Sequence, residues 1–325
     1  MTWRMLTAAA MVLAGVAGTA PVATAQEAPR GRQPFRSEVT DREVRSLSLG
    51  ADGMLALSNM VGDITVRTGE SRDIRLEIRR VSRGATEADA RLGLERVRVR
   101  VDEHANRATV ESDHPRERRA PYSVQVAYDV TAPIGTNVTI QSLAGNISAA
   151  GLSGELTAVT ATGNVVIRDA RRLSRARSAT GLVHLANVGS EGTLEAGTIA
   201  GAVTIDMVHA RRLLIGTVTG AVTARNATAD RAEVTTTAGR IEYAGTVASS
   251  GRYELRAHTG DVLFVPLGVA GFELRASTFT GRILPAADLG LVFLRKGARE
   301  IVGTVGDGRA VVTLATFSGD ILIER

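Results

Sequence analysis

Charged side chains recur at nearly equal intervals in the second half of the chain. They comprise three carboxylates, two guanidinium groups and one imidazole: Glu233, Glu254, Glu273, Arg256, Arg275 and His258. If residues one interval apart become neighbours across strands, the three carboxylates lie about 5 Å from one another. Like charges at that distance raise the pKa of one carboxyl group, which suits it to proton transfer, and the cluster could also hold a cation. A solvated face on which Glu and Arg neutralise each other explains the same residues and is the favoured interpretation.

No other catalytic arrangement is recognisable in the chain. It contains no Cys, which excludes disulfides, thiolate metal sites and cysteine nucleophiles. The motifs G-x-S-x-G, G-x-x-x-x-G-K-[ST] and H-E-x-x-H do not occur, so serine hydrolases of that type, P-loop proteins and zincins are not indicated. The five His are scattered, and none is paired at ligand spacing. We therefore expect no catalytic residue beyond the weak candidates above, no metal and no cofactor.

A glycine preceded by small or hydroxyl-bearing residues, and followed by an apolar residue two positions later, recurs along the chain. These glycines are Gly62, Gly145, Gly163, Gly181, Gly201, Gly220, Gly239, Gly260, Gly281 and Gly319. From Gly145 onward the intervals are 18, 18, 20, 19, 19, 21, 21 and 38 residues, the last being two periods of 19. Alternating apolar residues on either side predict strands with one buried face, and glycine permits the turn between them. A unit this short buries its apolar face only by stacking, so the period predicts a stacked repeat.

The predicted architecture is an all-β fold, a β-solenoid (β-helix) with about 19 residues per coil, over residues 136–325. In such a stack Val165, Val183 and Val203 form one internal column. Residues 284–309 depart from the repeat and are expected to be an irregular insertion. The chain stops six residues after its last repeat glycine, which predicts an exposed final strand and suggests an end-to-end homodimer.

Residues 44–135 are expected to form a region of strands with one short helix that caps the first coil, because an open solenoid end would invite edge pairing. Thr86 followed by Asp89 is a helix-start signal and predicts a helix over 86–95. The segments VRVRV and RATVES that follow flank a polar turn, which predicts a hairpin.

The first residues have the pattern of an export signal. Residues 1–25 combine Arg4, an apolar stretch of small residues and the cleavage site Ala23-Thr24-Ala25. Residues 26–43 are expected to form a linker. After cleavage no segment of spanning length remains, so we expect an exported protein in the periplasm, at the cell surface or outside the cell.

Arginine dominates the basic residues, since only Lys296 is a lysine among 39 Lys and Arg, and the formal net charge is +5. Arg171-Arg172 and Arg211-Arg212 lie about two repeats apart, with Glu191 between them and Asp230 one repeat later. These residues could form a basic stripe for an anionic polymer or an Arg–carboxylate ladder, and the ladder is the favoured interpretation.

Three segments carry a resemblance that extends over nearly all the mature chain. They are SNMVGDITVRTGESRDIRLEI, YSVQVAYDVTAPIGTNVTIQSLAGNI and VGDGRAVVTLATFSGDILIER. Their order, with the helix and hairpin between the first two, resembles the bacterial putative-adhesin family of unknown function. The resemblance implies an exported, right-handed β-solenoid and supplies no catalytic motif.

These observations favour a non-enzymatic, exported protein that is adhesin-like or acts as an envelope surface or scaffold binding protein. A polysaccharide lyase or hydrolase acting at the stacked carboxylates is an alternative, and a periplasmic accessory to envelope signalling is another. The expected partner is an envelope protein or an anionic polymer. Nucleic acid is not expected as a partner of an exported chain, despite its basic balance.

Overall fold

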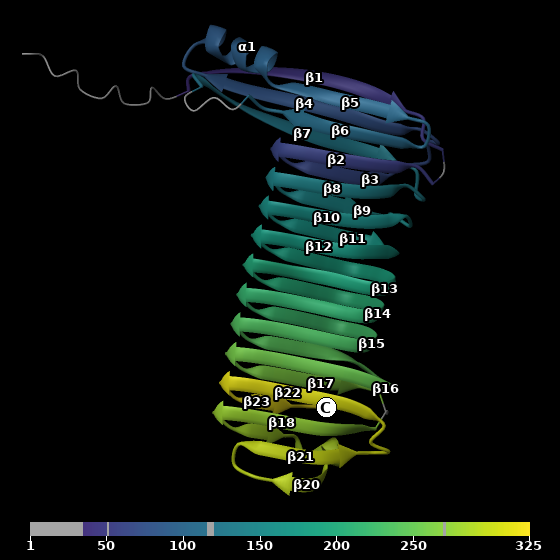
Figure 1. Cartoon of the computed structure of the whole chain (residues 1–325), viewed down its shortest axis with the longest axis vertical. Coiled ribbons are helices and arrows are strands. Elements are labelled where there is room, and N and C mark those ends of the chain that lie inside the picture. The colour runs from purple at the N-terminus through teal and green to yellow at the C-terminus, as the bar shows by residue number, and fades with distance from the viewer. Residues whose placement is uncertain (1–34, 51, 116–119, 269–270) are drawn as a thin grey trace, which may run out of the picture. The chain divides into compact units, whose positions relative to one another are not determined.

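The computed structural model describes residues 35–50, 52–115, 120–268 and 271–325. The expected signal peptide and the first part of the expected linker lie outside these residues. From Phe35 onward the chain is one compact unit that is mostly β-structure, with one α-helix among the described residues (Figure 1). The first strand begins at Ser37, so the described end of the expected linker is a strand.

The N-terminal region combines a helix with strands of both orientations. Its elements are β1 (Ser37–Leu47), β2 (Met54–Val61), β3 (Ile64–Thr68), β4 (Ile74–Gly84), α1 (Glu87–Arg96), β5 (Arg98–His104), β6 (Arg107–Asp113) and β7 (Tyr122–Ala132). The helix begins where predicted, because the Thr86 hydroxyl accepts from the Asp89 N–H while the Asp89 carboxylate accepts from the Thr86 N–H. β5 and β6 form the predicted antiparallel hairpin.

The rest of the chain is built from stacked strands. Its elements are β8 (Asn137–Ala144), β9 (Ile147–Ala150), β10 (Glu155–Thr162), β11 (Val165–Ala170), β12 (Arg172–Thr180), β13 (Val183–Ala200), β14 (Val203–Thr219), β15 (Val222–Ala238), β16 (Ile241–Thr259), β17 (Val262–Leu267), β18 (Phe272–Thr280), β19 (Ile283–Pro285), the 3-10 turn η1 (Ala287–Leu289), β20 (Val292–Lys296), β21 (Glu300–Val305), β22 (Ala310–Ser318) and β23 (Ile321–Ile323).

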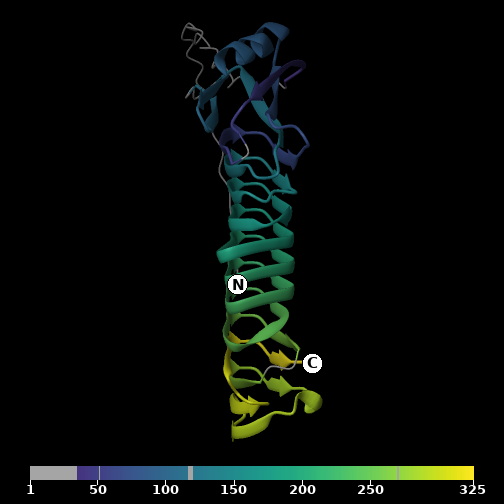
Figure 2. The ribbon, with the colours of Figure 1, turned by 90° about the vertical axis from the view of Figure 1, so that its right-hand side faces the viewer.

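Parallel pairing arranges these strands in two layers. Layer 1 contains β2, β8, β10, β12, the second parts of β13 to β16, β22 and β18. Layer 2 contains β3, β9, β11, the first parts of β13 to β16, β17, β23 and β19. The prediction that the stack begins at residue 136 was therefore wrong, because β2 and β3 already pair in parallel with β8 and β9. Figure 2 shows the backbone winding from one layer to the other. Apolar side chains of both layers form one continuous core.

The predicted internal column is confirmed. Val165 is in parallel register with Val183, and Val183 with Val203. All three side chains are fully buried. Residues about one repeat apart are therefore neighbours in space, as the glycine intervals predicted.

The repeat glycines lie at the turns between the layers, where no larger residue fits. Gly220 has φ +151°, and a Cβ atom there would lie 1.9 Å from the carbonyl oxygen of Gly201. Its N–H donates to the carbonyl of Ala238 at 2.9 Å. Glycine is required both by this close approach and by a φ that side chains rarely adopt.

A buried hydroxyl three residues before most of these glycines bonds to the glycine carbonyl of a neighbouring repeat. Its members are Thr160, Ser178, Thr198, Thr217, Thr236, Thr278 and Thr316. Thr217, for example, donates to the Gly201 carbonyl at 3.2 Å. Each such bond satisfies a polar group at a crowded turn, which explains the small hydroxyl residues of the repeat.

Ala257 occupies the hydroxyl position in β16 and interrupts this ladder. We expect Ala257→Thr to raise the free energy of unfolding by about 1 kcal/mol, because it supplies a donor for the Gly239 carbonyl. Thr217→Val should lower that energy by a similar amount by deleting a bond. Chemical denaturation measures both, with Thr223→Val as a control at an outward position. Equal effects of Thr217→Val and Thr223→Val would contradict the role of the ladder.

The last strands of the chain do not lie at the end of the stack. β22 pairs in parallel with β16 on one side and β18 on the other. Its glycine, Gly319, lies between Gly260 and Gly281, because Thr316 donates to the Gly260 carbonyl and Thr278 to that of Gly319. The prediction of an exposed final strand was therefore wrong. β18 therefore lies two strand positions from β16, and β22, which comes later in the chain, occupies the position between them.

A charged pair accompanies this insertion. Asp320 accepts from the backbone N–H and the guanidinium of Arg282, each at 2.8 Å. These hydrogen bonds from Arg282 lower the pKa of the Asp320 carboxyl group.

The expected irregular insertion, residues 284–309, includes the β20–β21 hairpin (Figure 1). β21 pairs antiparallel with β18, so β20 is the outermost strand there.

Candidate binding surface

The predicted carboxylates lie on the outer face of layer 1, but only two of them are neighbours. Glu233 and Glu254 are in parallel register on β15 and β16. On its other side Glu254 faces Thr313 of β22, and Thr313 in turn faces Arg275 of β18. The predicted stack of three carboxylates ending at Glu273 is therefore wrong, because the inserted strand separates β16 from β18.

Each of these three carboxylates forms an ion pair with an arginine. Glu254 pairs with Arg256 of the same strand, and Glu273 pairs with Arg275 at 2.8 Å. Glu233 lies 3.5 Å from the guanidinium of Arg212. These pairs agree with the favoured interpretation, a solvated face on which Glu and Arg neutralise each other. Ion pairs this exposed contribute little to stability.

His258 belongs to an aromatic stack and makes no ion pair with these carboxylates. Its ring lies 5.0 Å from that of Phe317 and nearly parallel to it, and Phe317 stacks on Phe279 at 4.8 Å. The guanidinium of Arg299 lies 5.8 Å from the Phe279 ring centroid. Phe279 and Phe317 thus belong to a surface stack, whereas Phe264 and Phe272 are fully buried in the core.

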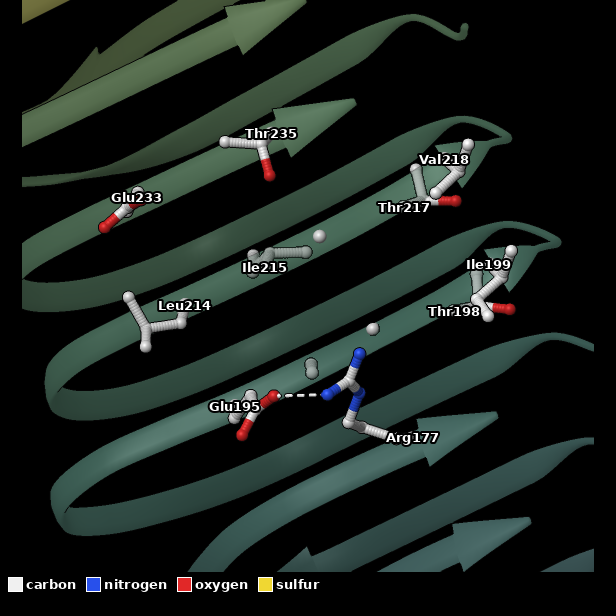
Figure 3. Close-up of a pocket in the computed structure, with 13 residues that line it drawn as sticks. Arg177, Glu195, Thr198, Ile199, Leu214, Ile215, Thr217, Val218, Glu233 and Thr235 are labelled. Atoms are coloured by element: carbon white, nitrogen blue, oxygen red, sulfur yellow. Dashed lines mark hydrogen bonds and ion pairs between the residues drawn. The ribbon is translucent and has the colours of Figure 1, made fainter. Parts of the chain in front are cut away.

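A shallow hollow of about 350 Å³ lies on the same outer face (Figure 3). Gly197 and Gly216, in register on β13 and β14, form part of its floor, since neither has a side chain to fill it. Leu214 lies along one side, and Ile199 and Val218 along the other (Figure 3). Ile199 and Val218 are 54% and 47% exposed. The hollow thus presents apolar side chains to solvent.

Charged side chains border this hollow. The Arg177 guanidinium bonds to the Glu195 carboxylate at 3.0 Å at one border, and Glu233 and Thr235 lie at the other (Figure 3). The hollow was not among the features predicted from the sequence. Its signal is a glycine at the same outward position in two successive repeats, in LEAGT and LLIGT.

A family model described as Toastrack DUF4097 matches residues 54–324. The chain belongs to this Toastrack family. The match begins at β2 and extends through the stacked repeats. It bears out the resemblance inferred from the order of segments along the chain.

Two solved structures of low sequence identity can be aligned with most of this chain. A putative adhesin from Bacteroides fragilis is 13% identical, with a TM-score of 0.38, covering 90% of this chain and 100% of that chain. A putative cell adhesion protein from Clostridium sporogenes is 11% identical, with a TM-score of 0.32, covering 88% and 99%. Because both TM-scores are low, neither structure carries a conclusion about this Toastrack chain. A comparison with curated proteins found no match.

Within the described ranges of this Toastrack chain, no three His, Asp or Glu side chains are grouped so that they could hold a metal ion. No helix in that same part of the chain is long and apolar enough to cross a membrane.

Proposed function

We propose that this Toastrack chain is a non-enzymatic, exported, adhesin-like protein that binds a surface or envelope partner through the outer face of layer 1. The observation that carries the proposal is the hollow above Gly197 and Gly216, with exposed Ile199 and Val218 beside it. Concave sites with apolar walls and a few polar groups at the border are typical binding sites. The closely paired strands beneath it offer such a site a rigid floor.

A substitution that fills the hollow tests this proposal. A Cβ atom at Gly216 would make an ordinary contact, 3.5 Å from the Thr235 hydroxyl, so Gly216→Phe places a ring in the hollow with little strain. We expect saturable binding of the fluorescently labelled protein to bacterial cells and to envelope fragments. Gly216→Phe should weaken this binding about tenfold, the effect of losing one good contact of roughly 1.4 kcal/mol.

Gly192→Phe is the matched control, because a Cβ atom at Gly192 meets no atom within 4 Å. It adds the same ring to the surface away from the hollow and should leave binding unchanged. Absence of saturable binding, or equal loss in the two variants, would contradict the proposal.

An enzymatic alternative is favoured by one observation, the register of Glu233 with Glu254. A polysaccharide lyase or hydrolase at this pair would lose turnover in Glu254→Gln, since a neutral amide cannot transfer the proton. We expect no turnover of acidic polysaccharides by the unaltered protein, measured by reducing ends and by ultraviolet absorbance of unsaturated products. Turnover by the unaltered protein that disappears in Glu254→Gln would contradict the non-enzymatic function and support the enzymatic alternative.

We further propose that the stack is a right-handed β-solenoid with about 19 residues per coil, capped by the N-terminal strands and α1. Parallel registers such as Val203 with Val222 support this coil length. An end-to-end homodimer stays a prediction. Its contact would involve β20, where Val292 and Leu294 are 67% and 71% exposed.

A further inference from the structure

The second part of β16 begins after extra residues that have no counterpart in β15. The interval from Gly239 to Gly260 is 21 residues, and the register between β15 and β16 shifts after Ala229. Residues 248–251 form the resulting bulge. Tyr253 fixes it, because its fully buried hydroxyl donates to the Ala229 carbonyl at 2.6 Å and accepts from the Ala248 N–H at 2.8 Å.

Three arginines form a column beside this bulge. Arg212 is in register with Arg231, and Arg231 with Arg252, on consecutive strands. Adjacent strands lie about 4.8 Å apart, so the three side chains repeat at that spacing along the stack. Like charges directly opposite each other on neighbouring strands are unfavourable unless something neutralises them.

The column is only partly neutralised by the protein. Arg212 has one ion pair, at 3.5 Å from Glu233. Within the described ranges, Arg231 and Arg252 have no carboxylate within ion-pair distance. The nearby Glu254 pairs instead with Arg256.

Two hollows meet at the bulge, of about 500 Å³ and 490 Å³. Arg212, Arg231, Ser250 and Gly251 line both of them. The arginines of the two hollows are Arg211, Arg212, Arg231, Arg252 and Arg309, which together with residues 248–251 we name the arginine corner. The carboxylates of the two hollows are Glu233, Glu254 and Asp230.

The chemistry of the arginine corner selects a ligand class. Guanidinium groups bind carboxylates and phosphates through paired hydrogen bonds. A row of cations at a constant spacing matches a linear polymer that carries a negative group on each unit. No aromatic side chain lines either hollow, so the bases of a single-stranded nucleic acid would find no ring to stack on. The volumes of the hollows are those of sites that take small organic groups such as sugars.

We propose that the arginine corner binds a linear acidic polysaccharide through the carboxylates of successive sugars. This inference goes beyond the proposed function, because the arginine corner lies outside the hollow above Gly197 and Gly216. The ion-paired glutamates leave Arg231 and Arg252 as the principal contacts. The bulge forms a wall that holds the polymer against the column.

The test measures binding of oligogalacturonate to the full chain by isothermal titration calorimetry, with neutral dextran and inorganic polyphosphate as comparison ligands. Arg231→Gln/Arg252→Gln should weaken oligogalacturonate binding about 10- to 100-fold, because two charge-assisted contacts are lost. Arg231→Lys/Arg252→Lys keeps the charge but not the paired hydrogen bonds and should give an intermediate loss. Arg98→Gln/Arg100→Gln is the matched control, with two exposed arginines removed from β5.

Dextran should not bind, and the control variant should bind oligogalacturonate as the unaltered chain does. Equal weakening in the control variant would mean attraction by net charge alone and would overturn the proposal. Unchanged binding in Arg231→Gln/Arg252→Gln would overturn it as well. Tighter binding of polyphosphate at the same residues would assign the corner to phosphate instead of a polysaccharide. If cells are bound but oligogalacturonate is not, this inference fails and the proposed function stands.

Discussion

Gly220→Ala is expected to destabilise the protein by at least about 3 kcal/mol. The added Cβ atom would lie 1.9 Å from the Gly201 carbonyl oxygen, which belongs to backbone and cannot move aside cheaply. The backbone at Gly220, with φ +151°, is also one that alanine rarely adopts. Relief of the clash must separate two adjacent strands, so the loss should extend to the pairing of β14 with β15. Thermal and denaturant unfolding measure the effect.

Gly192→Ala is the control for this substitution, since a Cβ atom there has open space. We expect its stability to lie within about 0.5 kcal/mol of the unaltered protein. A Gly220→Ala variant as stable as Gly192→Ala would show that the turns are not held as closely as the structure has them.

Removal of residues 309–325 is expected to disrupt the stack well beyond the deleted segment. The deletion removes β22 and β23, whose Val312, Leu314, Ile321 and Ile323 are fully buried. Their apolar contribution amounts to roughly 6–12 kcal/mol, at about 1.5–3 kcal/mol for each side chain. β18 would lose its parallel partner, and the core beneath β16 would be opened to water.

Hydrogen exchange distinguishes this outcome from that of a stack in chain order. With β22 between β16 and β18, the truncated protein should lose protection in both strands. In a stack that followed the chain, the deletion would remove only the terminal repeat, and β18 would remain packed on β16. Retained protection at Leu255 and Leu274 would contradict the inserted arrangement.

A pair of leucine substitutions separates core from surface in this region. Leu314 is fully buried, whereas Leu322 points outward and is half-buried. Leu314→Ala should therefore reduce protection in β16 and β18 together, and Leu322→Ala should change it little. Equal responses would indicate that β22 is not internal.

Local signals in the sequence were enough to predict several parts of the fold. The helix α1 follows from Thr86 and Asp89, three residues apart, because a capping box is made within one turn. The hairpin of β5 and β6 and the glycine turns follow from neighbouring residues in the same way. The column of Val165, Val183 and Val203 could be predicted from the repeat length alone. In a regular stack, residues one repeat apart occupy equivalent positions in successive repeats.

The candidate site was harder to predict because outward residues meet according to the order of the strands. Glu233 and Glu254 are neighbours as expected, but Thr313 takes the place expected for a third carboxylate. In the column of Arg212, Arg231 and Arg252, only Arg212 was singled out from the sequence. Recognising it required the register shift after Ala229, which skips the extra residues of the bulge.

The sequence by itself therefore determined the repeat, its turns and the buried face of each strand, because these depend on residues close together in the chain. Only the tertiary structure decided that β22 lies between β16 and β18. Every repeat carries the same alternation and the same glycine turn, so any strand edge of the stack can accept any other repeat. The choice between them depends on packing among distant residues, such as Leu314 between Leu255 and Ala276, which no local pattern records.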